Sequence, residues 1–261
     1  MGVCLKSRKR LISTRTIAVA STFAALYAIL RILPTFPMLG VSGSSFAAAD
    51  IVAPLYGVIL GPIIGPLSII IGTAFGFFGK PPVFLGLDFL PAVMNALLIG
   101  LLMRGKWAAS VGIYAIILAV FISNPLSLPF VDLGGTQIPF HWMHIVALAL
   151  LISPLGRKSA KWITDSSLRK SSLGLVTLAF IGSFIQHSTG GLLWETIFGN
   201  ILGIIPPNAF AEIWQAIFWI YPFERIFLIV ITSIVGIATI KGLNSAGLLL
   251  TKKDKYITAN R

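Results

Sequence analysis

The sequence predicts an all-α fold, a polytopic bundle of about eight transmembrane helices with both termini in the cytoplasm. Composition is the first reason. Of the 261 residues, 56% are hydrophobic and 11% are charged, and the mean hydropathy is +0.93. A soluble domain carries about 25% charged residues. Lipid therefore has to cover most of this surface.

The distribution of positive charge is the second reason. Seventeen of the 20 Lys and Arg residues fall into four short clusters, which long apolar stretches separate. Because cytoplasmic loops of membrane proteins are enriched in Lys and Arg, all four clusters are expected inside the cell. The net charge of +12 is then explained by topology and does not indicate nucleic acid. The clusters are Lys6, Arg8, Lys9, Arg10 and Arg15; Arg104 and Lys106; Arg157, Lys158, Lys161, Arg169 and Lys170; and Lys241, Lys252, Lys253, Lys255 and Arg261.

Prolines and glycines set the expected bounds of the first helices. A helix over residues 16–33 ends at Pro34, because proline cannot continue the backbone hydrogen-bond ladder. An outer loop over 40–45 follows. The next uncharged run holds Gly61-Pro62 in its middle, and we expect two helices, 46–60 and 62–78, instead of one. Only the additional crossing keeps the later basic clusters in the cytoplasm.

The remaining helices follow the same topology. Segment 191–205 is expected to be re-entrant or to lie on the outer face, since a crossing there would put the basic tail outside. One integral membrane domain, 16–240, thus lies between basic cytoplasmic tails, 1–15 and 241–261. The first apolar stretch is too long for a signal peptide, so no cleavage is expected. Helices are expected at 88–103, 107–122, 139–155, 173–187 and 223–240, with outer loops at 124–135 and 205–208.

The first half of the chain resembles a known family. The segment FAAADI begins at Phe46, LYGVILGP begins at Leu55, and DFLP at Asp88 opens a helix that reaches Gly100. Together with the alanine spacing of the first helix, these motifs resemble the S components of energy-coupling factor (ECF) vitamin transporters, over about residues 14–122. S components are the substrate-binding membrane subunits of these transporters, and the family has six spans. The chain departs from it in its additional spans, which follow about residue 156.

The resemblance implies a function and two kinds of site. The protein would capture a small water-soluble, vitamin-like nutrient outside and pass it inward with a coupling subunit and two ATPase subunits. The pocket would open outward, between the outer helix ends and loops. Ala20, Ala24 and Ala28 on the first helix would dock the coupling subunit. The residues alone leave a second interpretation open, because small side chains at this spacing also pack helices within one chain.

Polar side chains at the expected outer helix ends form the candidate binding site. A polar ligand in an apolar bundle needs a few convergent hydrogen-bonding groups. Arg31 and Lys80 are the cations near them, so an anionic ligand group should contact one of the two. We expect a cavity bordered by the first helix, the loop after the helix 62–78, and the helix 139–155. The polar candidates are Asp88, His141, His144, Gln186, His187 and Glu195.

Metal binding and enzymatic activity have weaker signals. His141 and His144 share a helix face, and His187 or Glu195 could complete a metal site; headgroups and water satisfy such histidines equally well. For Glu195, the possible charge partners are Arg31, Lys80 and Arg225. The single cysteine, Cys4, excludes an internal disulfide.

No nucleophile–base pair, phosphate-binding loop or dinucleotide fingerprint occurs in the sequence, so we expect no enzyme, no cofactor and no built-in ATPase. Two alternatives to solute capture stay open. One is a structural or accessory subunit of a membrane enzyme complex that has no ligand of its own, for which a tightly filled interior would be expected. The other is a membrane metal-binding or enzymatic protein built on the outer His and Glu residues.

Overall fold

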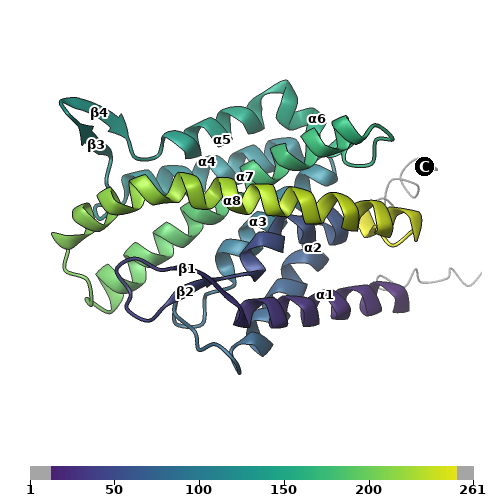
Figure 1. Cartoon of the computed structure of the whole chain (residues 1–261), viewed down its shortest axis with the longest axis horizontal. Helices are drawn as coiled ribbons and strands as arrows, with labels where there is room; N and C mark the ends of the chain where they lie inside the picture. Colours follow the sequence, from purple (N-terminus) through teal and green to yellow (C-terminus); the bar gives the residue numbers. More distant parts are fainter. Residues whose placement is uncertain (1–12, 252–261) are drawn as a thin grey trace, which may run out of the picture.

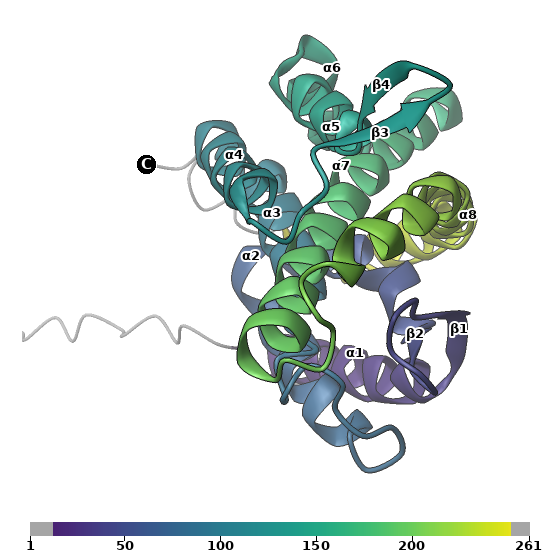
Figure 2. The ribbon, with the colours of Figure 1, turned by 90° about the vertical axis from the view of Figure 1, so that its left-hand side faces the viewer.

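The computed structural model describes residues 13–251, which form an elongated helical bundle with two small β-hairpins at one end (Figure 1). Seen from that end, α7 lies in the middle, with α1 on one side and α5 on the other (Figure 2). The elements are α1 (Thr14–Ile32), β1 (Pro34–Pro37), β2 (Ser45–Ala47), α2 (Ala49–Gly76), α3 (Leu90–Met103), α4 (Trp107–Ser123), β3 (Phe130–Leu133), β4 (Thr136–Pro139), α5 (Trp142–Ile152), α6 (Pro154–Trp162), α7 (Leu168–Trp194), the π-helical η1 (Glu195–Ile201) and α8 (Ala209–Ser245).

A sharp break at Gly61 divides α2 into two arms. Gly61 has φ +83°, a backbone conformation that side chains other than glycine rarely adopt, and Pro62 starts the second arm. The close approach of Gly65 to Tyr56 shows that the arms fold back on each other: a Cβ at Gly65 would lie 2.7 Å from the carbonyl oxygen of Tyr56. The predicted break between two helices at Gly61-Pro62 is therefore confirmed, whereas the first arm starts at Ala49 and not at residue 46, because residues 45–47 form β2.

Close backbone contacts join α1 and α3 to the two arms. A Cβ at Gly72 would lie 2.6 Å from the Ala24 carbonyl oxygen, and one at Gly100 would lie 2.6 Å from the Gly61 carbonyl carbon. Ala24 is 6% exposed. Ala24 thus packs within the chain, as the second interpretation of the alanine spacing expects. Ala20 and Ala28 flank it on the same helix, half-buried, and the Ala20 carbonyl accepts a hydrogen bond from Ser68 on α2.

The long helices α7 and α8 correct the prediction for the second half. Segment 191–205 is neither a re-entrant loop nor a separate span, since α7 continues through Trp194 into η1. The chain then turns, and α8 runs for 37 residues, about 55 Å at 1.5 Å per residue. The expected helix 223–240 is only the second part of α8, because the helix continues through Pro222.

The expected helix 139–155 is also shorter than predicted. Pro154 interrupts it, and the Ser153 side chain accepts a hydrogen bond from the Gly156 backbone N–H at the start of α6. Part of the expected basic loop is therefore helical. Arg157, on α6, places its guanidinium 3.7 Å from the ring centroid of Trp107.

Two antiparallel β-hairpins lie around the expected outer loops 40–45 and 124–135 and extend into the starts of the expected helices 46–60 and 139–155. In one, β1 pairs with β2 across the expected loop 40–45. In the other, β3 and β4 pair in regular register from Phe130 with Pro139 to Leu133 with Thr136. Gly134 and Gly135 both have positive φ at its two-residue turn. Figure 1 shows both hairpins away from the start of α1 and the end of α8.

Within residues 13–251, four helical segments have the length and apolar composition to cross a membrane: α1, α2 with its break at Gly61, the continuous α7–η1 helix and α8. Three shorter apolar helices, α3, α4 and α5, lie among them. Large apolar side chains also face outward, such as Phe223 at 75% and Ile234 at 68% exposure. These features are those of a helical membrane protein. The start of α1 and the end of α8 lie at the same end of the bundle, where the Arg15 guanidinium contacts the Gly247 carbonyl.

Candidate functional site

A cavity opens at the hairpin end of the bundle. It encloses about 1110 Å³ of atom-free space, including the part open to solvent. Its walls are the end of α1, the β1–β2 hairpin, the loop that follows α2, and the facing stretches of α7 and α8. Segments from the two halves of the chain thus form one site, and α4 and α5 contribute no lining residue.

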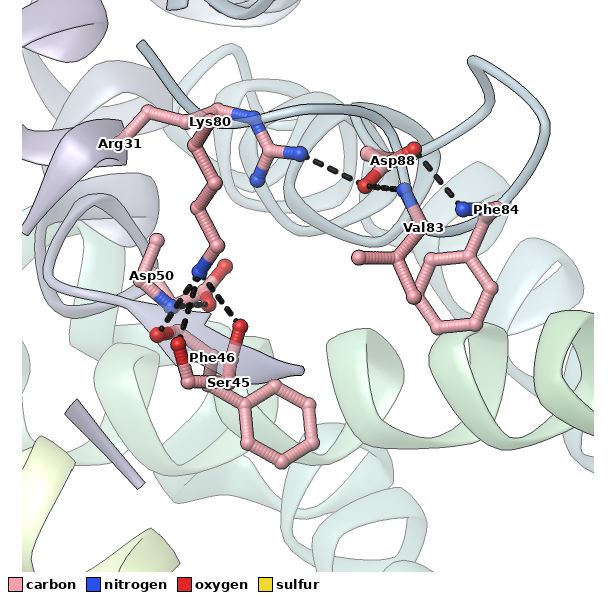
Figure 3. A network of polar contacts seen from close by, with 9 residues as sticks. Arg31, Ser45, Phe46, Asp50, Lys80, Val83, Phe84 and Asp88 are labelled. Atoms are coloured by element: carbon pink, nitrogen blue, oxygen red, sulfur yellow. Dashed lines mark hydrogen bonds and ion pairs between the residues drawn. The ribbon is translucent and has the colours of Figure 1, made fainter. Parts of the chain in front are cut away.

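A buried ion pair joins α1 to the loop after α2. The Arg31 Nη2 lies 2.6 Å from Asp88 Oδ1, and the two side chains are 10% and 4% exposed. The same carboxylate accepts hydrogen bonds from the backbone N–H groups of Val83 and Phe84 (Figure 3). Asp88 therefore neutralises Arg31 and fixes the loop that borders the cavity.

Lys80 ties the same loop to the β1–β2 hairpin. Its Nζ donates to the Ser45 carbonyl at 2.5 Å, to the Ser45 Oγ at 3.1 Å and to the Phe46 carbonyl at 3.3 Å (Figure 3). Partial burial lowers the pKa of Lys80, the nearby Arg31 lowers it further, and Asp50 and Asp88 oppose both effects. Three oxygen acceptors thus occupy all three donor positions of the ammonium group.

A chain of amide and carboxylate contacts crosses the bundle below the cavity. Gln186 on α7 donates to Asp50 Oδ1 at 2.8 Å and accepts from Asn95 on α3 at 2.7 Å. The second oxygen of Asp50 accepts from the Ala47 backbone N–H at 3.2 Å. Both carboxylate oxygens of Asp50 are therefore satisfied, and the first arm of α2 is linked to α3 and α7.

A second buried arginine lies on α8. Arg225 is 4% exposed and lines the cavity. Its nearest carboxylate is Glu224, with Nη2 and Oε2 3.6 Å apart, which is longer than a hydrogen bond. Its guanidinium carbon also lies 5.8 Å from the ring centroid of Phe46. From sequence, Arg225 is predicted only as a possible charge partner of Glu195; the signal that singles it out is a lone cation inside a long apolar stretch.

Six aromatic side chains contribute to the remaining wall. They come from both hairpin strands, the loop after α2, and α7 and α8, so the cavity offers flat apolar surfaces next to its charged groups. Such a combination is typical of sites for small organic molecules. The aromatic residues are Phe36, Phe46, Phe84, Trp194, Trp214 and Tyr221.

The three histidines lie together, but only His187 reaches the cavity. His144 Nε2 and His187 Nδ1 are 2.8 Å apart and share a hydrogen bond, and His141 Nε2 bonds the Ser127 hydroxyl at 3.2 Å. Burial lowers the pKa of His141 to about 4. Among the described residues, no group of three or more His, Cys, Asp or Glu side chains is arranged to hold a metal. A metal site on His141 and His144 therefore receives no support.

Glu195 is fully buried at the start of η1, outside the cavity wall. Neither carboxylate oxygen has a hydrogen-bond partner among the described residues, and none of the expected cations pairs with it. Arg31 pairs with Asp88 instead.

The cavity therefore agrees in part with the predicted site. Five of the eight proposed residues line it, and the three exceptions are His141, His144 and Glu195. The expected border by the helix 139–155 is wrong, because α7 and α8 take that place. The sequence reasoning did not select Asp50, Glu224 or Arg225. The five lining candidates are Arg31, Lys80, Asp88, Gln186 and His187.

Comparison with known proteins adds one relative. The chain is 28% identical over 199 residues to an uncharacterized protein of Methanocaldococcus jannaschii, a match that covers 75% of this chain and 61% of the relative. The chain thus spans less than two thirds of that relative's length. No protein-family model and no solved structure matches the sequence.

Proposed function

We propose that this protein is the substrate-binding membrane subunit of an ECF-type transporter, and that it captures a small water-soluble nutrient from outside the cell. The observation that carries this proposal is the cavity at one end of the bundle. It combines paired charges, an amide and aromatic walls, as small-molecule sites do. An accessory subunit without a ligand has no need of such a space in its interior.

The charge distribution supports an outward-facing cavity. Arg104 and Lys106 follow the end of α3, and Arg157 and Lys158 lie in α6, both away from the cavity. Lys and Arg are enriched on the cytoplasmic side of a membrane protein, so the cavity would face the other side. In this orientation both termini are cytoplasmic and the hairpins face outward. The protein would then lie in the cell membrane.

The sequence resemblance supplies the transport part of the proposal. The motifs at Phe46, Leu55 and Asp88 resemble S components, and two of these segments contribute Asp50 and Asp88 to the cavity wall. The chain would hand its solute inward together with a coupling subunit and two ATPases. Since Ala24 packs against α2, the coupling subunit would have to contact a different surface.

Retention of a solute on the purified protein tests the proposal. Gly190 lines the cavity and a Cβ there meets only Pro91, at 3.8 Å and 4.0 Å, so Gly190→Phe should fill the space without displacing backbone. The matched control is Gly112→Phe, because nothing lies within 4 Å of a Cβ at Gly112. We expect mass spectrometry to detect one solute on the wild type and on Gly112→Phe, and none on Gly190→Phe.

Purification in mild detergent tests the partners in the same experiment. Co-purifying ATPases and a coupling protein are expected. A solute retained without these partners would support solute binding but contradict the ECF assignment. If no solute distinguishes wild type from Gly190→Phe, the proposed function is wrong.

A further inference from the structure

The cations of the cavity differ in how far their hydrogen-bonding capacity is used. Arg31 has a close carboxylate at 2.6 Å, and Lys80 has three oxygen acceptors. Both were the expected contacts for an anionic ligand, and both are occupied by the protein itself. Arg31 keeps one buried nitrogen, Nε, without a partner, but Asp88 neutralises its charge at close range, and Lys80 needs no ligand to be solvated.

Arg225 differs from them in its ion pair. Its Nε is buried without a partner, as that of Arg31 is, but its contact with a carboxylate is 3.6 Å long, against 2.6 Å for Arg31. Among the described residues, the acid that pairs with it is Glu224, at 3.6 Å. A buried arginine with five donors and one long ion pair is under-satisfied, and such a group costs free energy until an acceptor reaches it.

The acids around Arg225 are largely committed elsewhere. Asp50 holds Gln186 and the Ala47 N–H, and Asp88 holds Arg31 and two backbone N–H groups. Glu224 is half-buried, and it is the acid that competes with a ligand for Arg225. The under-satisfied group beside the cavity is therefore a positively charged hydrogen-bond donor, the guanidinium of Arg225.

We propose that the cavity selects a small organic anion with a flat apolar body, whose carboxylate binds Arg225. Planar guanidinium and carboxylate groups fit each other in a bidentate geometry. The rings of Phe46 and Trp194, both in the cavity wall, provide surfaces for the body of the ligand. This inference rests on the proposed function and specifies its substrate class.

Benzoate and benzamide are suitable probes, because they share shape and differ in charge. Their binding is measured by titration calorimetry on the full chain purified in detergent. We expect benzoate to bind at least roughly tenfold more tightly than benzamide, as a charge-assisted hydrogen bond implies. In Arg225→Gln this preference should disappear.

Two further variants make the test specific. Lys80→Gln removes a positive charge from the same cavity and should keep the preference for benzoate, since Lys80 is saturated by protein oxygens. Glu224→Gln removes the competing carboxylate and should tighten benzoate binding several-fold. Arg225→Lys retains the positive charge but not the planar guanidinium. It should therefore bind benzoate more weakly than the wild type and more tightly than Arg225→Gln. This intermediate affinity distinguishes loss of the contact from loss of the fold.

The outcomes decide the two proposals separately. Four results would overturn the selection of an anion by Arg225. The two probes bind equally, or neither binds. The preference for benzoate is lost equally in Lys80→Gln and Arg225→Gln, or Glu224→Gln binds benzoate no more tightly than the wild type. The proposed function would survive each of these results if the Gly190→Phe experiment shows a retained solute.

Discussion

At the end of the bundle where α1 begins and α8 stops, helices meet through glycine. A Cβ at Gly57 would lie 2.6 Å from the Ala96 carbonyl oxygen, and Gly100 meets the break at Gly61 equally closely. At the other end a cavity lies between the end of α1, the β1–β2 hairpin, α7 and α8, and contacts such as Arg31–Asp88 and Lys80–Ser45 connect its walls through longer side chains.

The difference shows that one bundle can combine closely packed helices at one end with a cavity at the other. In lipid, helices associate through close packing and polar contacts, since no hydrophobic effect drives apolar surfaces together. Small residues supply the packing at the terminal end. At the cavity end polar contacts replace it, and they leave space that side-chain packing would fill. Substitutions at the two ends should therefore fail for different reasons.

The largest effect is expected from the ion pair at the cavity end. Asp88→Ala leaves Arg31 buried without a carboxylate and removes two acceptors for loop N–H groups. Loss of one partner of a buried pair costs about 3–5 kcal/mol. The free energy of unfolding in detergent, measured by denaturant titration, should fall by about that amount.

Asp132→Ala is the matched control. Asp132 also accepts a hydrogen bond from a backbone N–H, that of Gly135, but it is exposed on the β3–β4 hairpin. Its loss should cost less than about 1 kcal/mol. Similar costs for the two variants would show that the Arg31–Asp88 pair does not hold the cavity end together.

A smaller effect is expected at the glycine contacts. In Gly100→Ala the new methyl group meets the backbone of Gly61 and Pro62, which cannot rotate away, so destabilisation by about 2–3 kcal/mol is expected. Gly112→Ala adds the same methyl group on α4 in open space and should be neutral or stabilising by up to about 1 kcal/mol. Thermal unfolding of both variants compares them directly; equal melting temperatures would refute the close contact.

The smallest stability effect concerns α1. Ala24→Leu overfills the contact with Gly72, and because α1 lies at the edge of the bundle and can shift, we expect a loss of about 1–2 kcal/mol. Ala25→Leu places the same side chain on the exposed face of α1 and should change stability by less than about 0.5 kcal/mol. If Ala24→Leu behaves like Ala25→Leu, Ala24 is available to a partner after all.

The sequence predicted the first half of the fold better than the second, for physical reasons. Backbone chemistry fixes a break at Gly61-Pro62 and a helix end before Pro34, so both could be predicted locally. In the second half, the expectation for segment 191–205 rested on charge topology and not on local sequence, and the expected helix 223–240 missed the first part of α8, which continues through Pro222. The two hairpins were missed because strands of three or four residues leave little period-two pattern.

The candidate site was predicted in part for a related reason. Charged residues at helix ends, such as Arg31 and Asp88, are visible from sequence alone. The contact between Gln186 and Asp50 spans 136 positions, so no local pattern reports it. Arg225 lies near the start of the expected helix 223–240, but no local pattern shows that its side chain lines the cavity.

Orientation in the membrane tests the comparison of the two ends most directly. In a Cys4→Ser background, single cysteines replace Thr136, exposed at the hairpin end, and Ser166, exposed between α6 and α7. An impermeant thiol reagent added to intact cells should label Thr136→Cys, and should label Ser166→Cys only after permeabilisation. Labelling of Ser166→Cys in intact cells, with Thr136→Cys protected, would put the cavity on the cytoplasmic side and contradict capture of a solute from outside.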